Sequence, residues 1–434
     1  MGGRRGLGSI LRAPAHGRLR RARVGVTAAF ALGGALCGVL TSRIPALMDE
    51  LAISPSQLGG VLFVWGLGAV ASTQALRWVM ARTGSAPVLR VAAPLYASTL
   101  ALVACAQSYG LLLAAVAVFG MGLGAVDVAA NSQGSATERA YGRPLVAGIH
   151  AGWPVGAGVG GLVAAFCAHL GVPYRSTLVG AAVLALPVAL ALGRTLLDTR
   201  HGGHPRRHDR SRSRTRPVVY GFGVIAFAAL AIEVAVTDWT GVLLHDGLGT
   251  SQAVAALAYP LFQAGILTGR VVADRLRTWL GARVVLVSAG AATAGLLALT
   301  AAPQPLVVLV GICGVGVAIS PVLPLAFSLA GTSDAQSSDA AIAQLGVIAY
   351  AGVLASPAMI GVLADAATLR VALVVVAIAL GAAIVLAGLL LPIDYADIRL
   401  RVGALPQQAR RGSEAAGDVA GPQAPMTRMD SDVI

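Results

Sequence analysis

Few ionisable side chains interrupt the long apolar runs of this sequence, and those few are the candidates for chemistry. Asp127, His150 and Glu233 each fall inside a run long enough to cross a bilayer. A charge in hydrocarbon is costly, so residues of this kind mark ion pathways or ion pairs. Asn131 follows Asp127 by four residues, which places both side chains on one face of a helix. The pattern indicates proton transfer or ion pairing inside a membrane.

Asp127 and His150 are expected at similar depth near one membrane face. Asp127 comes ~24 Å along its run, and His150 comes ~7–8 Å into the next run, which returns from that face. One hypothesis is a proton-sensitive pair at the inner mouth, because a carboxylate favours the protonated imidazole and His titrates near physiological pH. The alternative is that Asp127 pairs with Arg77, Arg82 or Arg139 and locks an inner gate.

The composition is that of a membrane protein. Of the 434 residues, 56% are hydrophobic and 12% are charged, whereas soluble domains carry about 25% charged residues. An ordinary cytosolic enzyme and a secreted disulfide-linked scaffold are both excluded, because too little charge is present to cover their surfaces. A membrane-spanning helix needs ~20 apolar residues. The sequence predicts an all-α membrane protein with twelve such helices, at 24–41, 56–79, 87–106, 111–130, 145–168, 173–193, 218–237, 252–273, 284–302, 305–329, 340–363 and 369–391.

The arginines predict the orientation of these helices. The formal net charge is +13, and all 32 basic residues are Arg. If the N-terminus is cytoplasmic, only Arg43, Arg175 and Arg370 fall outside, and the other 29 of the 32 lie towards the cytoplasm. Basic residues favour cytoplasmic loops, so we predict a multi-pass protein of the inner (cytoplasmic) membrane with both termini in the cytoplasm. The arginine clusters lack interleaved aromatic residues, which argues against a nucleic-acid partner.

Polar segments divide the chain into five parts. They are an Arg-rich cytoplasmic tail at 1–23, a six-helix half at 24–193, a basic cytoplasmic linker at 194–217, a second six-helix half at 218–391 and a disordered cytoplasmic tail at 392–434. The halves echo each other at an offset of 194, which aligns Gly120 and Gly122 with Gly314 and Gly316. Two six-helix halves joined by a basic loop are typical of secondary transporters built from repeats.

This layout and several motifs resemble the major facilitator superfamily. The cytoplasmic loop motif of that superfamily is a Gly-rich turn with Asp and Arg. After the second run, Arg82 and Gly84 match it, and Ala81 stands where an Asp is usual. The second half has a fuller copy, formed by Gly269, Arg270, Asp274 and Arg275.

Other motifs resemble one branch of that superfamily, a group of bacterial inner-membrane facilitators distantly similar to fucose–proton symporters. These motifs are Arg43-Ile44-Pro45, the stretch 127–134, His150-Ala151-Gly152-Trp153 and Asp238-Trp239. The resemblance implies two pseudo-symmetric six-helix halves and alternating access, and it gives no substrate.

In the layout that this resemblance implies, the first and seventh helices face a central cavity. Arg43 ends the first helix, and Glu233 lies in the outer third of the seventh. We therefore expect Arg43 to pair with Glu233 or Asp238 across the outer mouth, as an outer gate. The alternative is that Arg43 reaches the interface and Asp238 lies in a loop.

Uncharged polar and aromatic side chains within the runs are candidates for the substrate cavity. They are Trp65, Gln74, Trp153, Gln263 and Gln344. Each could contact a substrate or only a neighbouring helix, since interhelical hydrogen bonds are common in membranes.

Enzyme motifs are missing from the sequence. The stretch 120–124 has the glycine spacing of a dinucleotide loop but lies within an apolar run, and no phosphate loop is present. The four cysteines lie in apolar runs with no metal-ligand spacing. We predict no catalytic residues, no cofactor and no metal.

The interpretation that we favour is a monomeric secondary transporter in the lipid bilayer, coupled to protons and moving a small organic solute. Asn131 is the only Asn in the chain, and sugar sites need many hydrogen-bonding groups, so we favour export of an apolar or amphiphilic compound. Proton-coupled uptake of a sugar or similar metabolite is one alternative. A membrane sensor or scaffold that does not transport is another.

Overall fold

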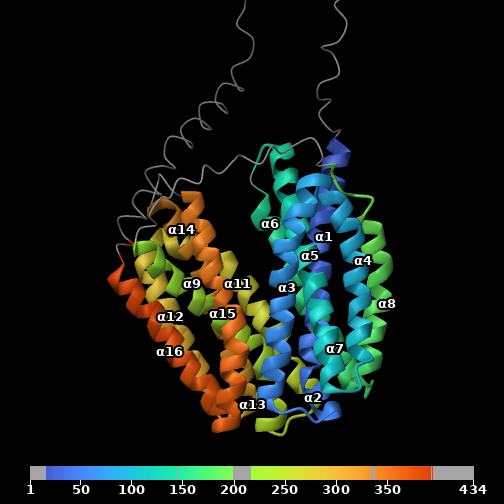
Figure 1. The fold of residues 1–434 in the computed structure, drawn as a ribbon. Coiled ribbons are helices and arrows are strands. Elements are labelled where there is room, and N and C mark those ends of the chain that lie inside the picture. The colour runs from blue at the N-terminus through green and yellow to red at the C-terminus, as the bar shows by residue number, and fades with distance from the viewer. Residues whose placement is uncertain (1–15, 144, 199–216, 334–337, 392, 394–434) are drawn as a thin grey trace, which may run out of the picture.

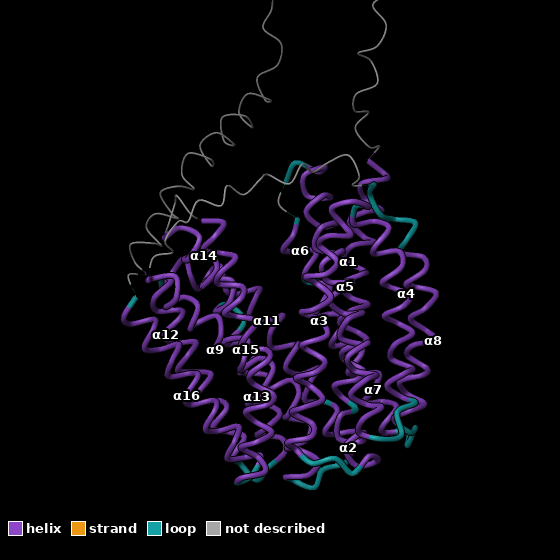
Figure 2. The backbone as a smooth tube through the Cα atoms, viewed as in Figure 1, coloured by secondary structure: helices purple, strands orange, loops and turns teal. Residues whose placement is uncertain are grey.

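The computed structural model describes residues 16–143, 145–198, 217–333, 338–391 and 393. Helices joined by short loops make up this described part, and it contains no strand (Figure 2). The predicted all-α membrane fold is confirmed. Most of the two predicted tails (1–15, 392 and 394–434) and the central part of the predicted linker (199–216) lie outside the described residues. Residues 16–23 of the predicted Arg-rich tail are helical and form the first turns of α1.

The described part of the N-terminal half contains eight helical segments. They are α1 (His16–Ser42), α2 (Ile44–Leu51), α3 (Pro55–Thr83), α4 (Ser85–Ala104), α5 (Tyr109–Tyr141), α6 (Val146–His150), α7 (Gly152–His169) and α8 (Tyr174–Leu192).

The C-terminal half repeats this arrangement with more interruptions. It contains α9 (Pro217–Val242), a π-helical turn η1 (Leu243–Gly247), α10 (Gln252–Ala256), α11 (Ala258–Leu280), α12 (Ala282–Ala298), a 3₁₀ turn η2 (Leu299–Ala301), α13 (Pro305–Ile319), α14 (Val322–Ser333), α15 (Ser338–Ala366) and α16 (Leu369–Leu390).

Eleven stretches of helix in the described part are long and apolar enough to cross a membrane. The shorter apolar helix α12 occupies the place of the ninth predicted span. Each predicted run therefore has a helix, although several helices outlast their apolar runs. α5 continues to Tyr141, eleven residues beyond the predicted end at 130. Hydropathy missed these last turns because they are polar and lie beyond the apolar layer, and hydropathy detects only the apolar part of a helix.

Local signals in the sequence set the helix ends. The Ser54 hydroxyl accepts a hydrogen bond from the Gln57 amide N–H, and the Gln57 side chain accepts one from the Ser54 N–H. This reciprocal capping satisfies two donors at the start of α3. α3 ends at Gly84, which has φ of +80°, a left-handed conformation that glycine adopts without strain.

Glycines let α1 and α7 pack with their backbones in contact. A methyl group added at Gly152, Gly156 or Gly160 would overlap a carbonyl oxygen of α1, those of Thr27, Ala31 and Ala35 respectively. The three glycines recur every four residues, so they share one face of α7. Small residues in this pattern let membrane helices approach closely.

The two halves use glycine equivalently, at an offset that differs from the predicted one. Gly120 faces the Trp65 carbonyl of α3, and Gly316 faces the Phe262 carbonyl of α11. Gly314, the predicted counterpart of Gly120, instead faces the side chain of Leu296 in α12. The structural equivalence at these glycines therefore has an offset of 196 residues, and the predicted offset of 194 is wrong there.

The halves converge at one end of the bundle and diverge at the other (Figure 1). We call the first the α2 end, since it carries α2 and the turns near Gly171 and Gly249. We call the second the tail end, since α1 begins there and α16 finishes there. Close contacts between the halves lie towards the α2 end, where Gly59 of α3 meets the Pro357 carbonyl of α15 and Gly241 lies against the Pro45 ring.

Candidate functional site

Asp127 lies in α5, half-buried, towards the tail end. The Asn131 amide nitrogen, one turn further along the helix, donates to the Asp127 carboxylate at 3.0 Å and to the Asp127 carbonyl at 2.9 Å. Among the described residues, no cation lies within ion-pair distance of Asp127. The expected gate pairing with an arginine is therefore not formed in this conformation.

His150 is the last residue of the short helix α6. Its ring stacks at a tilt on Phe30 of α1, with centroids 4.4 Å apart. No hydrogen bond joins it to Asp127 in the described part, so the structure does not bring these two predicted partners together. Instead, the Arg270 guanidinium of α11 lies within electrostatic range of His150 from the opposite half.

Glu233 and Asp238 lie in α9, both half-buried. Glu233 is within electrostatic range of Arg270 of its own half. Asp238 accepts a hydrogen bond from the Thr237 hydroxyl at 3.3 Å. The Arg270 guanidinium is thus within electrostatic range of both His150 and Glu233, although the sequence assigned Arg270 only to the loop motif.

Arg43 separates α1 from α2 and is 4% exposed. Its Nη2 donates to the Val172 carbonyl at 2.9 Å, and burial lowers the pKa of the guanidinium. Its Nε and Nη1 atoms are buried without a hydrogen-bond partner among the described residues. The expected ion pair with Glu233 or Asp238 is therefore not formed, because the side chain turns towards the α7–α8 connection.

The five cavity candidates have different surroundings. Trp65 packs edge-on against Phe119 within its own half, with centroids 5.2 Å apart, and Trp153 lies against Gly33 of α1. Gln263 is buried beside the Tyr259 hydroxyl. Gln74 of α3 is exposed, and Gln344 of α15 is half-buried.

The loop motif lies at the tail end in both halves. Arg82 donates to the Trp78 carbonyl at 3.2 Å and lies 5.9 Å from the Trp78 ring centroid, and Gly84 ends α3. In α11, Gly269 fits against the backbone of Val317 in α13. Arg270 and Arg275 are exposed, and the Asp274 side chain lies outside the described part.

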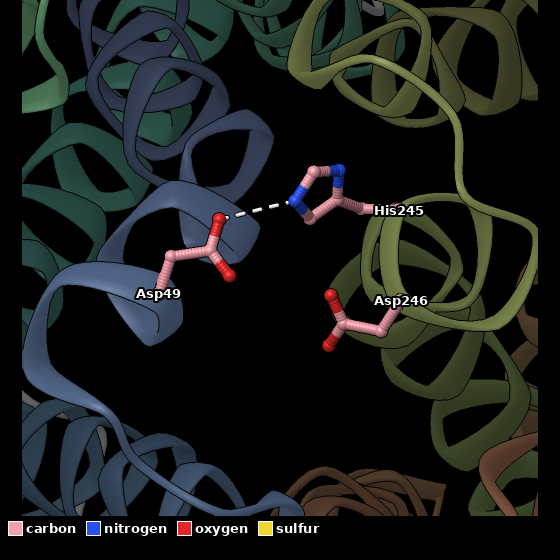
Figure 3. A group of neighbouring side chains, drawn as sticks. All are labelled: Asp49, His245 and Asp246. Atoms are coloured by element: carbon pink, nitrogen blue, oxygen red, sulfur yellow. Dashed lines mark hydrogen bonds and ion pairs between the residues drawn. The ribbon is translucent and has the colours of Figure 1, made fainter.

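A polar cluster at the α2 end was not predicted from the sequence. His245 Nε2 lies 3.0 Å from the Asp49 carboxylate, and Gln252 Nε2 lies 2.7 Å from the same oxygen. Asp246 brings a second carboxylate, and the ligand atoms of Asp49, His245 and Asp246 all lie within 4.8 Å of one another (Figure 3). Glu50, next to Asp49, pairs separately with Arg175 at 2.6 Å.

The spacing of the two halves would have revealed this cluster. Asp49 and His245 are 196 residues apart, which is the offset that relates Gly120 to Gly316. Glu50 and Asp246 have the same spacing. Polar residues at equivalent positions next to a pseudo-two-fold axis face each other. An offset of 194 does not align Asp49 with His245, so it did not predict their contact.

Comparisons with known proteins agree with this architecture. The sequence model of the Major Facilitator Superfamily matches residues 25–338 of this chain. The uncharacterized transporter y4wD of Sinorhizobium fredii is 33% identical over 81% of this chain and 93% of its own length. An uncharacterized MFS-type transporter of Yersinia pestis is 28% identical over 82% of this chain and 93% of its own length.

Solved structures share the fold at low sequence identity. A point mutant of the nucleoside transporter NupG superposes with a TM-score of 0.72 and 14% identity, over 86% of this chain and all of that one. The family match covers most of the chain and agrees with the spans and the two halves described above. The chain therefore belongs to the major facilitator superfamily and is a membrane transporter, not an enzyme.

Proposed function

We propose that this protein is a proton-coupled secondary transporter that exports an amphiphilic organic solute by alternating access. Proton coupling is inferred from three carboxylates within the spans that have no cationic partner. Asp127, Glu233 and Asp238 form no ion pair with any described residue. A carboxylate in the membrane without a cation beside it can take up a proton without first breaking a salt bridge.

Asp127 is the proton carrier that we favour. Its hydrogen-bond donor is a neutral amide, that of Asn131, so its protonation neutralises the site and leaves no partner charge behind. Tyr350 of α15, in the other half, lies within electrostatic range of the carboxylate. A change of charge at Asp127 is therefore felt across the interface that must open and close.

The orientation is proposed from the arginines. Of the described arginines, only Arg43, Arg175 and Arg370 lie at the α2 end. Four others line a cavity of about 450 Å³ at the tail end, Arg18, Arg21, Arg90 and Arg194, where they would meet anionic headgroups. The tail end is assigned to the cytoplasm, and the structure then represents a state closed towards the outside.

The hydrogen bonds of the amide side chains within the protein favour an amphiphilic solute. Asn131 is hydrogen-bonded to Asp127, Gln133 is hydrogen-bonded to Ser85, and Gln57 caps α3. These amides are occupied within the protein, which leaves few groups for the hydroxyls of a sugar. Each buried hydroxyl needs a partner, so the solute is expected to offer mainly apolar surface.

Proteoliposomes loaded with the pH indicator pyranine test the proposal. Ethidium serves as the amphiphilic probe, and fucose and uridine serve as hydroxyl-rich probes. With an acidic interior, ethidium should enter in exchange for protons, and the interior should become alkaline faster than without it. Asp127→Asn should reduce this proton flux at least about tenfold while ethidium still exchanges for ethidium. The matched control is Asp365→Asn, an exposed carboxylate at the end of α15.

Each contrary result identifies a different alternative. Undiminished proton flux in Asp127→Asn would remove Asp127 as the carrier. Acidification of the interior when fucose or uridine is added outside would indicate proton-coupled uptake. A wild-type protein that binds ethidium but drives no flux would favour a sensor.

A further inference from the structure

The cluster of Asp49, His245 and Asp246 joins the two halves at the α2 end (Figure 3). Asp49 comes from α2 of the N-terminal half, and His245 and Asp246 come from the π-helical turn η1 that ends α9. The contact between Asp49 and His245 is 3.0 Å long. The proton-carrying residues proposed above take no part in it.

The tautomer of His245 makes this contact unusual. His245 Nδ1 lies 2.7 Å from the Thr250 carbonyl, and a carbonyl only accepts, so Nδ1 must carry a hydrogen. In the neutral ring, Nε2 then presents its lone pair to the Asp49 carboxylate. Two acceptors 3.0 Å apart repel each other unless a positive species lies between them. An Nδ1–H held by a carbonyl is also the arrangement that orients metal-binding imidazoles.

Gln252 has a second unsatisfied group at the same place. Its Nε2 lies 2.7 Å from Asp49 and 3.0 Å from His245 Nε2, so its two hydrogens can serve both acceptors. Its Oε1 is buried and has no hydrogen-bond partner in the described part. The two ends of an amide have nearly the same shape, so a half-turn would direct this oxygen at the cluster without repacking.

We propose that Asp49, His245 and Asp246 bind a divalent transition-metal ion of the Zn²⁺ type. Imidazole nitrogen excludes Ca²⁺ and Mg²⁺ as the preferred ions, and a mixed nitrogen and carboxylate set suits zinc. Ligand atoms around tetrahedral zinc are ~3.4 Å apart, so small rotations of the exposed Asp246 side chain close the site. Two carboxylates balance the charge of the ion, and Gln252 Oε1 is its fourth ligand.

The ion would tie the halves together in the conformation described here. Its ligands are divided between α2 of one half and η1 and α10 of the other, so separation of the halves at the α2 end takes Asp49 away from the other three. A ligand that binds one conformation better shifts the population towards it. Bound Zn²⁺ therefore favours the state that is closed at the α2 end and slows its opening.

Zinc binding by the purified full-length protein tests the site without any transported solute, so the result is independent of the proposed function. Binding is measured by competition with a fluorescent zinc chelator at pH 7.5, and melting temperature is followed in Zn²⁺ and in EDTA. Every sample carries His201→Gln, His204→Gln and His208→Gln, so that the linker supplies no imidazole. Asp49→Asn, His245→Gln and Asp246→Asn are compared with His169→Gln, which alters an exposed histidine outside the cluster.

One Zn²⁺ per chain is expected, with affinity at least about tenfold weaker in each of the three ligand variants and unchanged in His169→Gln. Asp246→Asn is the most informative variant, because it leaves the contact between His245 and Asp49 in place and removes a metal ligand. Its melting temperature in EDTA should equal that of the parent, which shows that the protein is folded. Absence of saturable binding in the parent, or equal binding by Asp246→Asn or His245→Gln, overturns the proposal and leaves a protonated imidazole as the bridge.

Discussion

The Arg43 guanidinium is buried where the protein gives it one hydrogen bond. Nη2 reaches the Val172 carbonyl, and the other two nitrogens have no partner in the described part. A cavity of about 440 Å³ adjoins the side chain, and Asp49, Glu50 and Gln252 are among its lining residues. A buried charge without an ion pair costs stability, so Arg43 is explained better by a movement in transport than by the stability of this state.

Replacement of Arg43 by Met should therefore stabilise the protein. Burial lowers the pKa of Arg43, which means that folding disfavours its charged form. We expect Arg43→Met to gain about 1 kcal/mol, or ~2 °C in melting temperature, in detergent at pH 7.

The pH dependence of that gain follows from the same shift. The folded state gives up the proton more readily than the unfolded state, so the penalty is fully present at neutral pH. It declines as the pH rises through the lowered pKa, because the unfolded state then holds more protons and stability rises with pH. The advantage of Arg43→Met should therefore be fully present at pH 7 and should shrink only as the pH rises towards the lowered pKa, in melting curves of both proteins. A melting temperature below that of the wild type at pH 7 would contradict this account.

The sequence located the membrane-embedded ionisable residues and placed Asn131 on the helix face of Asp127, but it did not give their partners on other helices. Depth along a helix follows from residue count, and it placed Asp127 and His150 near one end. Rotation of each helix about its axis comes from packing against neighbours, which directs His150 to Phe30 and leaves Asp127 with Asn131. For the same reason, the structure does not form the predicted contact of Arg43 with Glu233 or Asp238.

At the scale of elements, backbone contact between α1 and α7 is the feature most sensitive to side-chain size. Gly156 fits against the Ala31 carbonyl with no room for a methyl group, whereas Gly158 has no atom within 4 Å of an added methyl group. Both glycines lie in α7 and have the same helix propensity, so the same substitution at the two positions gives a matched pair of variants.

Gly156→Val should separate α1 from α7 and cost of order 3 kcal/mol. Gly158→Val should be tolerated within about 0.5 kcal/mol, since only its own rotamer freedom changes. Thermal unfolding in detergent, followed by size-exclusion chromatography, measures both. Equal melting temperatures for the two variants would show that the α1–α7 contact does not limit stability.

Apolar runs predicted the spans well because a bilayer demands length and hydropathy together. The same criterion could not find α2, which has eight residues and two adjacent acidic side chains, Asp49 and Glu50. Nor could it find the π-helical turn η1. Both depend on contacts across the bundle, and both contribute to the cluster at the α2 end.

For the whole molecule, orientation in the membrane can be measured with a natural cysteine. Cys105 is exposed at the α2 end, whereas Cys37 is buried and Cys167 and Cys313 are half-buried. A membrane-impermeant maleimide should therefore label Cys105 in intact cells if the α2 end faces outwards. Labelling should fall by about tenfold in Cys105→Ala, since thiolate reactivity follows exposure.

The control for orientation uses the other end of the bundle. Arg143, exposed in the loop that follows α5, is changed to Cys in the Cys105→Ala background. This variant should be labelled only after the cells are permeabilised. The opposite pattern in the two variants would reverse the proposed orientation.

The 196-residue spacing between Asp49 and His245 has a consequence for how such a protein could arise. In a dimer of identical six-helix subunits, a residue on the two-fold axis meets its own copy, so an Asp there would face an Asp and be repelled. Fusion of two copies into one chain removes that restriction, because each copy can then mutate alone. A change of one partner to His replaces two carboxylates that repel by a pair that a bound cation or a proton on the imidazole holds together, and only the fused gene can encode it.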